Sequence, residues 1–207
     1  MSPAAFTRLD VEERRRRLLE LGAELFTRNA YNELSMAQIA REAGISKALL
    51  YHYFSSKQEF FLATIGQAAA ELRDRTEPDP SLPPLEQLRG SLDAFLALIE
   101  ERSLAYRKLM ETASTVPEVR DLVGQVRRFT AGRILEGLLP GGEPPPTARA
   151  AVGAWLWFMD GACLDWLEHG DFDRHELVDL LLGTLLGSLA AATGAPVTSG
   201  PAPPPAE

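Results

Sequence analysis

Met36 to Lys57 reads MAQIAREAGISKALLYHYFSSK, and it contains two short helical patterns separated by a glycine. Ile39 and Ala43 lie on one apolar face of the first pattern, as a helix packed closely on another requires. Gly44 can adopt the left-handed backbone that closes a helix, and Ser46 can cap the next one. The segment therefore predicts two helices joined by a tight turn, which is a helix-turn-helix.

The second of these helices, Lys47 to Phe54, has an unusually aromatic outward side. Leu50 and Phe54 are four residues apart and are expected to point inward. Tyrosine, histidine and lysine tips suit a DNA major groove, where they meet phosphates and base edges. The alternative is that Tyr51 or Tyr53 packs under a neighbouring helix, because tyrosine is often half buried. The residues left facing outward are Lys47, Ala48, Leu49, Tyr51, His52 and Tyr53.

The run IAREAGISKALLYHYFSSKQEFF resembles the DNA-binding signature of the tetracycline-repressor (TetR) family of bacterial transcriptional regulators. The shared features are small residues before Ala-Gly, a Ser-Lys step, the Tyr-His-Tyr-Phe string and a lysine three residues later. The resemblance covers roughly Leu18 to Ile65. Leu49 stands where the family commonly has a small or hydroxyl residue, which favours an apolar contact such as a thymine methyl.

Serines precede each helix of this segment. Ser35 is predicted to cap the first helix, and Ser56 the helix that follows the motif. Lys57 can then bind a phosphate alongside the backbone N–H groups of a helix start. We expect Tyr53 and Lys57 to hold phosphates and His52 to read a base edge. The full predicted DNA-binding set is Ser35, Lys47, Ala48, Leu49, Tyr51, His52, Tyr53 and Lys57.

The net charge of −8 is distributed unevenly. Residues 1–60 carry nine Lys or Arg against eight Asp or Glu, and the remainder carries 12 against 21. A near-neutral head can bind DNA if its basic groups converge on one face, while an acidic body discourages nonspecific binding. Charge alone does not indicate DNA binding.

Composition is that of an intracellular globular chain with two domains. The 207 residues are 45% hydrophobic and 24% charged, which suits one good core and a smaller domain. The single cysteine, Cys163, excludes an internal disulfide and is expected to be a buried thiol. We find no apolar signal region near the N-terminus and no transmembrane span, so a cytoplasmic location is expected.

Before the motif, residues 1–10 are predicted to form a loose arm and Val11 to Asn29 a helix. Four arginines, Arg14 to Arg17, lie in its first turns. They could grip phosphates beside the reading helix or reach a minor groove. Equally, they could form an ordinary solvated helix face, so both interpretations stay open.

The chain after the motif shows helical periodicity and no strand pattern of useful length, so the fold class is all-α. We predict an N-terminal arm and three-helix DNA-binding domain over residues 1–56. An effector-binding and dimerisation domain follows over residues 57–193, beginning with an interdomain helix over 57–76, and residues 194–207 form a disordered tail. The later helices are predicted at 85–103, 104–113, 117–139, 148–169 (capped by Thr147) and 173–193.

The last two predicted helices are apolar nearly all round, as helices covered on every side are. Gly183 and Gly187 form a GxxxG pair, but the apolar run from Leu180 to Ala192 is too short for a membrane span. We predict a four-helix seam between two chains, and the TetR resemblance implies the same homodimer. The predicted interface residues are Trp157, Gly161, Leu164, Leu181, Gly183, Thr184, Leu185, Gly187 and Ser188.

The second domain is rich in large adaptable side chains and lacks a recognisable catalytic motif, so we expect no enzyme activity and no cofactor. Such a bundle suits a cavity for a small apolar or amphipathic effector, which the TetR resemblance also implies. The predicted pocket residues are Phe95, Tyr106, Met110, Phe129, Trp155, Phe158 and Met159.

The sequence thus predicts a regulator, most simply a repressor, that binds a palindromic operator as a dimer and is released by an effector. Two other classes stay open. One is an all-helical enzyme on an apolar substrate, for which Asp160 or Asp165 could act as acid or base. The other is a scaffold without DNA binding. A metal at His169, Asp171, Asp173 and His175 is disfavoured, because aspartates beside a helix start usually cap it.

Overall fold

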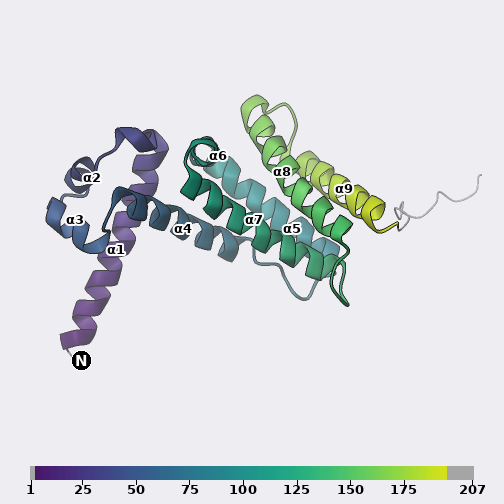
Figure 1. Ribbon diagram of the computed structural model, residues 1–207, viewed down its shortest axis with the longest axis horizontal. Coiled ribbons are helices and arrows are strands. Elements are labelled where there is room, and N and C mark those ends of the chain that lie inside the picture. The colour runs from purple at the N-terminus through teal and green to yellow at the C-terminus, as the bar shows by residue number, and fades with distance from the viewer. Residues whose placement is uncertain (1–2, 195–207) are drawn as a thin grey trace, which may run out of the picture. The chain divides into compact units, whose positions relative to one another are not determined.

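A computed structural model of the chain describes residues 3–194, and all regular secondary structure within that range is helical (Figure 1). This confirms the all-α prediction. The disordered tail predicted over residues 194–207 lies outside the described residues apart from Gly194. The elements are α1 (Pro3–Arg28), the 3₁₀ turn η1 (Tyr31–Glu33), α2 (Met36–Glu42), α3 (Lys47–Tyr53), α4 (Lys57–Arg75), α5 (Pro84–Glu101), α6 (Ser103–Thr115), α7 (Pro117–Leu138), α8 (Pro146–His169) and α9 (Arg174–Thr193).

The chain divides into two compact units. Unit 1 comprises Met1–Glu77 and Leu98–Gly124, and unit 2 comprises Pro78–Ala97 and Gln125–Glu207. Helices α5 and α7 therefore each have residues in both units. This packing division differs from the functional division predicted at residues 56 and 57, which stays a prediction.

Unit 1 is built on the crossing of α1 and α4. Gly22 of α1 lies where a Cβ atom would come within 2.6 Å of the Thr64 hydroxyl oxygen and 2.8 Å of the Phe60 ring. Only glycine lets the two helices approach this closely. Phe26 and Phe61 then pack edge to face with ring centroids 4.4 Å apart, at a geometry that aromatic pairs favour.

The end of α6 and the first turns of α7 complete this core. Val119 and Val123 of α7 are buried in the same cluster as the helix-turn-helix residues Ile39 and Leu50. Partly buried Met110 of α6 packs against it. The core that holds the helix-turn-helix is thus shared with a segment roughly 70 to 80 residues further along the chain.

Two helix starts differ from the predictions. Helix α1 begins at Pro3 rather than Val11, because proline suits the first turn of a helix and no breaker follows it. Helix α8 begins at Pro146, so Thr147 lies inside it and is not its cap. The Thr147 hydroxyl instead donates to the carbonyl oxygen of Ala192, at 2.8 Å, near the end of α9.

Unit 2 centres on α8 and α9, which lie side by side (Figure 1). Leu177, Leu181 and Leu185 of α9 are fully buried. The indole N–H of Trp155 donates to the carbonyl oxygen of Leu181 at 2.9 Å, so this aromatic ring is buried with its polar atom satisfied. Cys163 is fully buried, as predicted.

Two ion pairs tie α5 to α9 within unit 2. Arg89 lies 2.7 Å from the Asp179 carboxylate, and Arg174 lies 2.9 Å from the Asp93 carboxylate. The charges are reciprocal, because each helix supplies one acid and one base. The order of the pairs shows that α5 and α9 run in opposite directions where they meet.

Candidate nucleic-acid interface

Local hydrogen bonds set the positions of α2, α3 and α4. The Ser35 hydroxyl accepts the backbone N–H of Gln38, the Ser46 hydroxyl that of Leu49, and the Ser56 hydroxyl that of Glu59. Each serine is therefore the N-cap that the sequence predicts. Gly44 has φ of +65°, the left-handed conformation expected of the turn.

Helix α3 presents the predicted face. Leu50 and Phe54 are buried in the core of unit 1, and Lys47, Ala48, Tyr51 and His52 are exposed. Leu49 and Tyr53 are half-buried. The Lys47 ammonium lies 5.7 Å from the centroid of the Tyr51 ring, one helical turn away. A lysine, two tyrosines and a histidine thus share one short helix, and three of these four side chains are exposed.

Tyr53 partly follows the alternative interpretation. Its ring packs against the core of unit 1, but its hydroxyl is within reach of Arg14, whose Nη1 donates to it at 3.4 Å. The polar tip is therefore at the edge of the domain, near α1. Tyr51, in contrast, is 44% exposed and does not pack under a neighbouring helix.

Lys57 has a structural task that the sequence does not reveal. Its ammonium donates to the carbonyl oxygens of Tyr31, at 2.9 Å, and Leu34, at 3.0 Å. It also lies 4.2 Å from the centroid of the Tyr31 ring. Because an ammonium has three donors, these two bonds leave one for the predicted phosphate contact, which stays a prediction. The carbonyl partners are 26 and 23 residues away, so no local pattern indicates them.

The predicted dimer residues do not all lie on a free face. Leu181 and Leu185 are completely buried within the single chain, between α9 and α8. A partner cannot bury them further, so we correct their assignment from interface to core. Trp157 is 64% exposed. Gly161, Gly183 and Ser188 are also exposed, and Leu164, Thr184 and Gly187 are half-buried.

The predicted pocket residues are divided between the two units. Tyr106 and Met110 belong to unit 1, where Met110 packs against the helix-turn-helix core. In unit 2, Trp155 is buried, and Phe95 and Met159 are half-buried. Phe129 and Phe158 are 54% and 43% exposed. The assignment of these residues to an effector pocket stays a prediction.

Asp160 is held by Arg127, a residue that the sequence analysis missed. Arg127 Nε and Nη2 lie 2.8 and 2.5 Å from Asp160 Oδ2, and both side chains are largely buried. The guanidinium also lies 3.8 Å from the centroid of the Trp157 ring. The partner of Asp160 is thus neither solvent nor a second chain. Arg127 is 33 residues away on α7, and no spacing signal connects the two.

The turn between α8 and α9 is explained by capping. Asp173 accepts the backbone N–H of Glu176 at 2.9 Å, and the His169 ring nitrogen lies 3.1 Å from the Asp165 carbonyl oxygen. The pKa of exposed His169 is raised, first by this backbone bond and then by the Asp165 carboxylate. Among residues 3–194, no group of three or more His, Cys, Asp or Glu side chains is placed to hold a metal ion.

In the part of the chain that the structure describes, α9 alone has the length and apolar composition of a membrane span. Its leucines at 177, 181 and 185 are fully buried within unit 2. The core helix of a globular unit passes the same test of composition, so this helix does not indicate a membrane protein.

The all-helical fold and the exposed, serine-capped second helix of the motif define a helix-turn-helix DNA-binding protein. Comparison with known families agrees. Residues 18–64 match the model of bacterial regulatory proteins of the tetR family, and residues 84–187 match the tetracyclin repressor-like C-terminal domain. The chain belongs to the TetR family of transcriptional regulators.

Individual relatives support this assignment. The chain is 40% identical over 178 residues to the HTH-type transcriptional regulator BetI of Agrobacterium fabrum, covering 82% of this chain and 80% of that protein. It is 36% identical over 110 residues to the HTH-type transcriptional activator FasR of Mycolicibacterium smegmatis, covering 50% of this chain and 48% of that protein. A tetR-family regulator from Streptomyces coelicolor superposes with a TM-score of 0.76, at 29% identity, covering 88% of this chain and 83% of that one.

Proposed function

We propose that this protein is a ligand-responsive repressor that binds a palindromic operator as a homodimer and is released by a small apolar or amphipathic effector. Repression and ligand binding are typical of the family. As a regulator of this kind it has no enzymatic activity, and it acts on chromosomal DNA in the cytoplasm.

The outward face of α3 is the observation that carries the proposal. Lys47, Tyr51 and His52 are exposed on a helix of seven residues that buries Leu50 in the core behind it. Exposed aromatic and basic tips on a rigidly capped helix have no packing role, whereas in a major groove they meet base edges and phosphates. We assign base reading to His52 and an apolar thymine contact to Leu49.

Dimerisation follows from the size of this head, because one helix-turn-helix reads only a few base pairs and useful affinity needs two. The surface that supports pairing is the exposed apolar face of α8 and α9. Its exposed large apolar side chains are Trp157, Phe158, Leu180 and Leu186, and Gly161 and Gly183 are also exposed. Large apolar side chains exposed on two adjacent helices are typical of an interaction surface. We therefore replace the buried Leu181 and Leu185 with this face as the proposed interface.

The effector is proposed to bind in the second domain and to be apolar or amphipathic. What supports this is the domain's supply of aromatic and methionine side chains, including Phe95, Trp155 and Met159. The two largely buried charged side chains of this domain, Arg127 and Asp160, form an ion pair with each other within the chain. The effector-binding residues stay proposals.

Selection of bound sequences from random duplex DNA tests this function. The proposal expects an enriched palindrome with half-sites about 34 to 36 Å apart, or a multiple of one turn. On that operator, His52→Ala should relax specificity at one position of each half-site, at a cost of about 1 to 3 kcal/mol there. A random duplex of equal length is the control, because equal losses on both DNAs would remove His52 from base reading.

Absence of any enriched sequence would contradict the DNA-binding role. A reporter placed behind the selected operator then separates the two regulatory outcomes. The proposal expects lower expression when the protein is present. Higher expression would show an activator instead and would leave the operator assignment intact.

A further inference from the structure

Four arginines precede the buried residues of α1 along the helix. Leu18 and Leu19 are buried in the core of unit 1. Residues four positions earlier lie on the same faces of the helix, one turn closer to its start. These are Arg14 and Arg15, and both are half-buried, whereas Arg16 and Arg17 are exposed. The helix therefore divides the four arginines into an inward and an outward pair.

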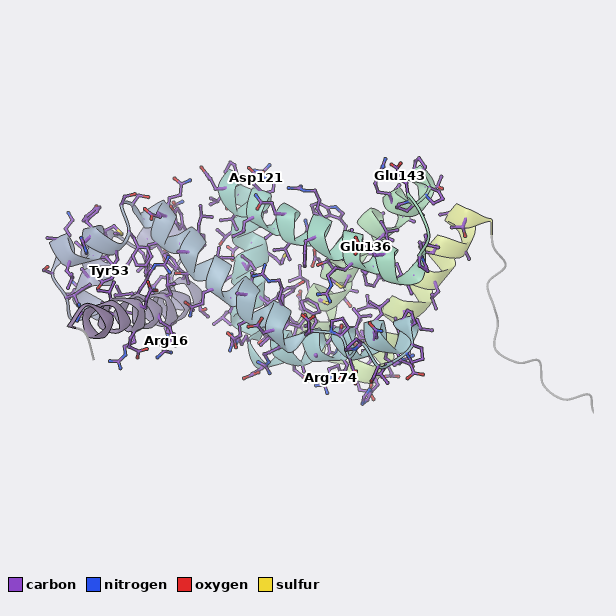
Figure 2. All side chains as sticks on the ribbon, turned by 90° about the horizontal axis from the view of Figure 1, so that it is seen from below. Arg16, Tyr53, Asp121, Glu136, Glu143 and Arg174 are labelled. Atoms are coloured by element: carbon purple, nitrogen blue, oxygen red, sulfur yellow. The ribbon has the colours of Figure 1, made fainter. Side chains whose placement is uncertain are left out.

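The outward pair is bound to carboxylates of the same helix. Arg16 Nε lies 3.0 Å from Glu13 Oε2, and Arg17 Nε lies 2.8 Å from Glu13 Oε1. Arg16 also bonds to Glu20. Figure 2 shows the Arg16 side chain turned outward from α1, on the side away from Tyr53. These exposed pairs are the solvated helix face that charge runs commonly form.

The inward pair reaches α3 and its C-cap. Arg14 Nη1 donates to the Tyr53 hydroxyl at 3.4 Å, and the Arg15 guanidinium carbon lies 5.2 Å from the centroid of the Phe54 ring. Arg15 thus places its guanidinium over a core ring, in a cation–π contact. Arg14 alone among the four contacts a polar tip of the reading helix.

We propose that Arg14 and Tyr53 together bind one phosphate of the DNA backbone beside α3. This inference rests on the proposed function, because it assumes that α3 enters the major groove. A hydroxyl that accepts from a guanidinium keeps its own hydrogen to donate to an anion. A guanidinium presents forked donors that match phosphate oxygens, and its charge makes these bonds strong.

The length of the Arg14–Tyr53 bond and the position of Lys57 support this assignment. At 3.4 Å the bond is longer than the usual range, so it engages the Arg14 guanidinium only weakly. The lysine expected to supply the local cation, Lys57, already donates to two carbonyl oxygens. Arg14 of α1 therefore supplies a positive charge at the end of α3, because the Tyr53 hydroxyl itself is uncharged.

The test is a salt titration of operator binding, followed by fluorescence anisotropy of the labelled duplex. Arg14→Ala should lower the magnitude of the slope of log affinity against log salt by about one unit per bound protomer. Operator and random duplex should be weakened alike, since a phosphate contact carries no sequence information. Arg17→Ala is the matched control on the same helix and should leave the slope unchanged, because its guanidinium faces Glu13.

Two further variants make the outcome specific to a phosphate contact. Arg14→Lys keeps the charge and should restore the slope, which a merely structural role would not predict. The double variant, Arg14→Ala with Tyr53→Phe, should lose less operator affinity than the sum of the losses in the two single variants. Such non-additivity is expected of two residues that contact the same phosphate. Circular dichroism melting of each variant checks that the fold is retained.

Different results would contradict the Arg14 phosphate contact and the proposed DNA-binding function. If the wild-type protein enriches an operator and Arg14→Ala keeps the wild-type slope, the Arg14 assignment is wrong and the proposed function stands. An equal slope change in Arg17→Ala would also overturn it, because general loss of positive charge would then explain the effect. If the wild-type protein enriches no DNA, the proposed function fails and the inference fails with it.

Discussion

The ammonium of Lys57 lies 2.9 Å from the backbone carbonyl oxygen of Tyr31, and it bonds the carbonyl oxygen of Leu34 as well. The first residue of α4 thereby holds the segment between α1 and α2 in place. Charge-assisted bonds of this kind are stronger than neutral ones, and breaking them leaves two carbonyl groups without their donor.

Replacing Lys57 should therefore affect folding as well as DNA binding. We expect Lys57→Ala to lower the free energy of unfolding by about 1 to 3 kcal/mol, measured by urea denaturation. Lys47→Ala is the control, since exposed Lys47 lies only over the Tyr51 ring and should change stability by less than about 1 kcal/mol. Unchanged stability in Lys57→Ala, with a smaller salt slope, would show that phosphate binding is its main role.

The crossing of α1 and α4 should not tolerate a methyl group. In Gly22→Ala, the new Cβ would meet Thr64 Oγ1 at 2.6 Å and the Phe60 ring at 2.8 Å. Such overpacking costs about 1 to 3 kcal/mol of unfolding free energy. Gly66→Ala on α4 is the matched control, because its Cβ would meet nothing within 4 Å. It should stabilise the protein by up to about 1 kcal/mol, through higher helix propensity.

Equal effects of Gly22→Ala and Gly66→Ala in the same urea experiment would show that α1 and α4 adjust freely. The close approach of the helices at Gly22 would then make no difference to the unfolding free energy.

Exposed and buried positions of α8 and α9 should respond differently to substitution. Trp157→Asp places a charge on the proposed interface and should give a folded monomer in sedimentation velocity, because Trp157 is already 64% exposed in the single chain. Leu185→Ala removes a fully buried side chain and should cost about 2 to 5 kcal/mol of unfolding free energy. A dimer that survives Trp157→Asp would exclude this face from pairing.

Acid should weaken the contact between α4 and the start of α6. Arg102, the residue before α6, donates to both oxygens of Glu71 at 2.8 and 2.6 Å, and these bonds lower the pKa of Glu71. A carboxyl whose pKa is lower in the folded state stabilises that state above its unfolded pKa of about 4.3. This stability is lost as the pH falls from there through the folded pKa.

Because both side chains are more than a third exposed, the contribution should be below about 1 kcal/mol. The measurement is the difference in unfolding free energy between wild type and Glu71→Gln, which should shrink as the pH is lowered. A pH-independent difference for Glu71 would contradict the assignment.

Local chemistry explains which features could be predicted from the sequence. The caps at Ser35, Ser46 and Ser56 depend on residues three positions away, and the burial of Leu50 and Phe54 follows from helical spacing. These predictions are confirmed.

The predictions that failed, and the contacts that were missed, depend on tertiary structure. An apolar helix such as α9 gives no periodic signal for its buried side, so Leu181 and Leu185 could not be distinguished from the exposed Leu180 and Leu186. The partners of Lys57 and Arg127 are more than 20 residues away. Long-range contacts of this kind leave no trace in local spacing.

The most direct test of the central claim, control of operator binding by an effector, is a pair of titrations. A panel of apolar and amphipathic compounds is first screened by tryptophan fluorescence for the compound that binds the protein. The affinity for the operator is then measured with and without that compound, and its own affinity with and without the operator. We predict that each ligand weakens the binding of the other by one common factor of about 5- to 150-fold, because coupling between two sites is reciprocal. A compound that binds tightly and leaves operator affinity unchanged in both titrations would contradict it.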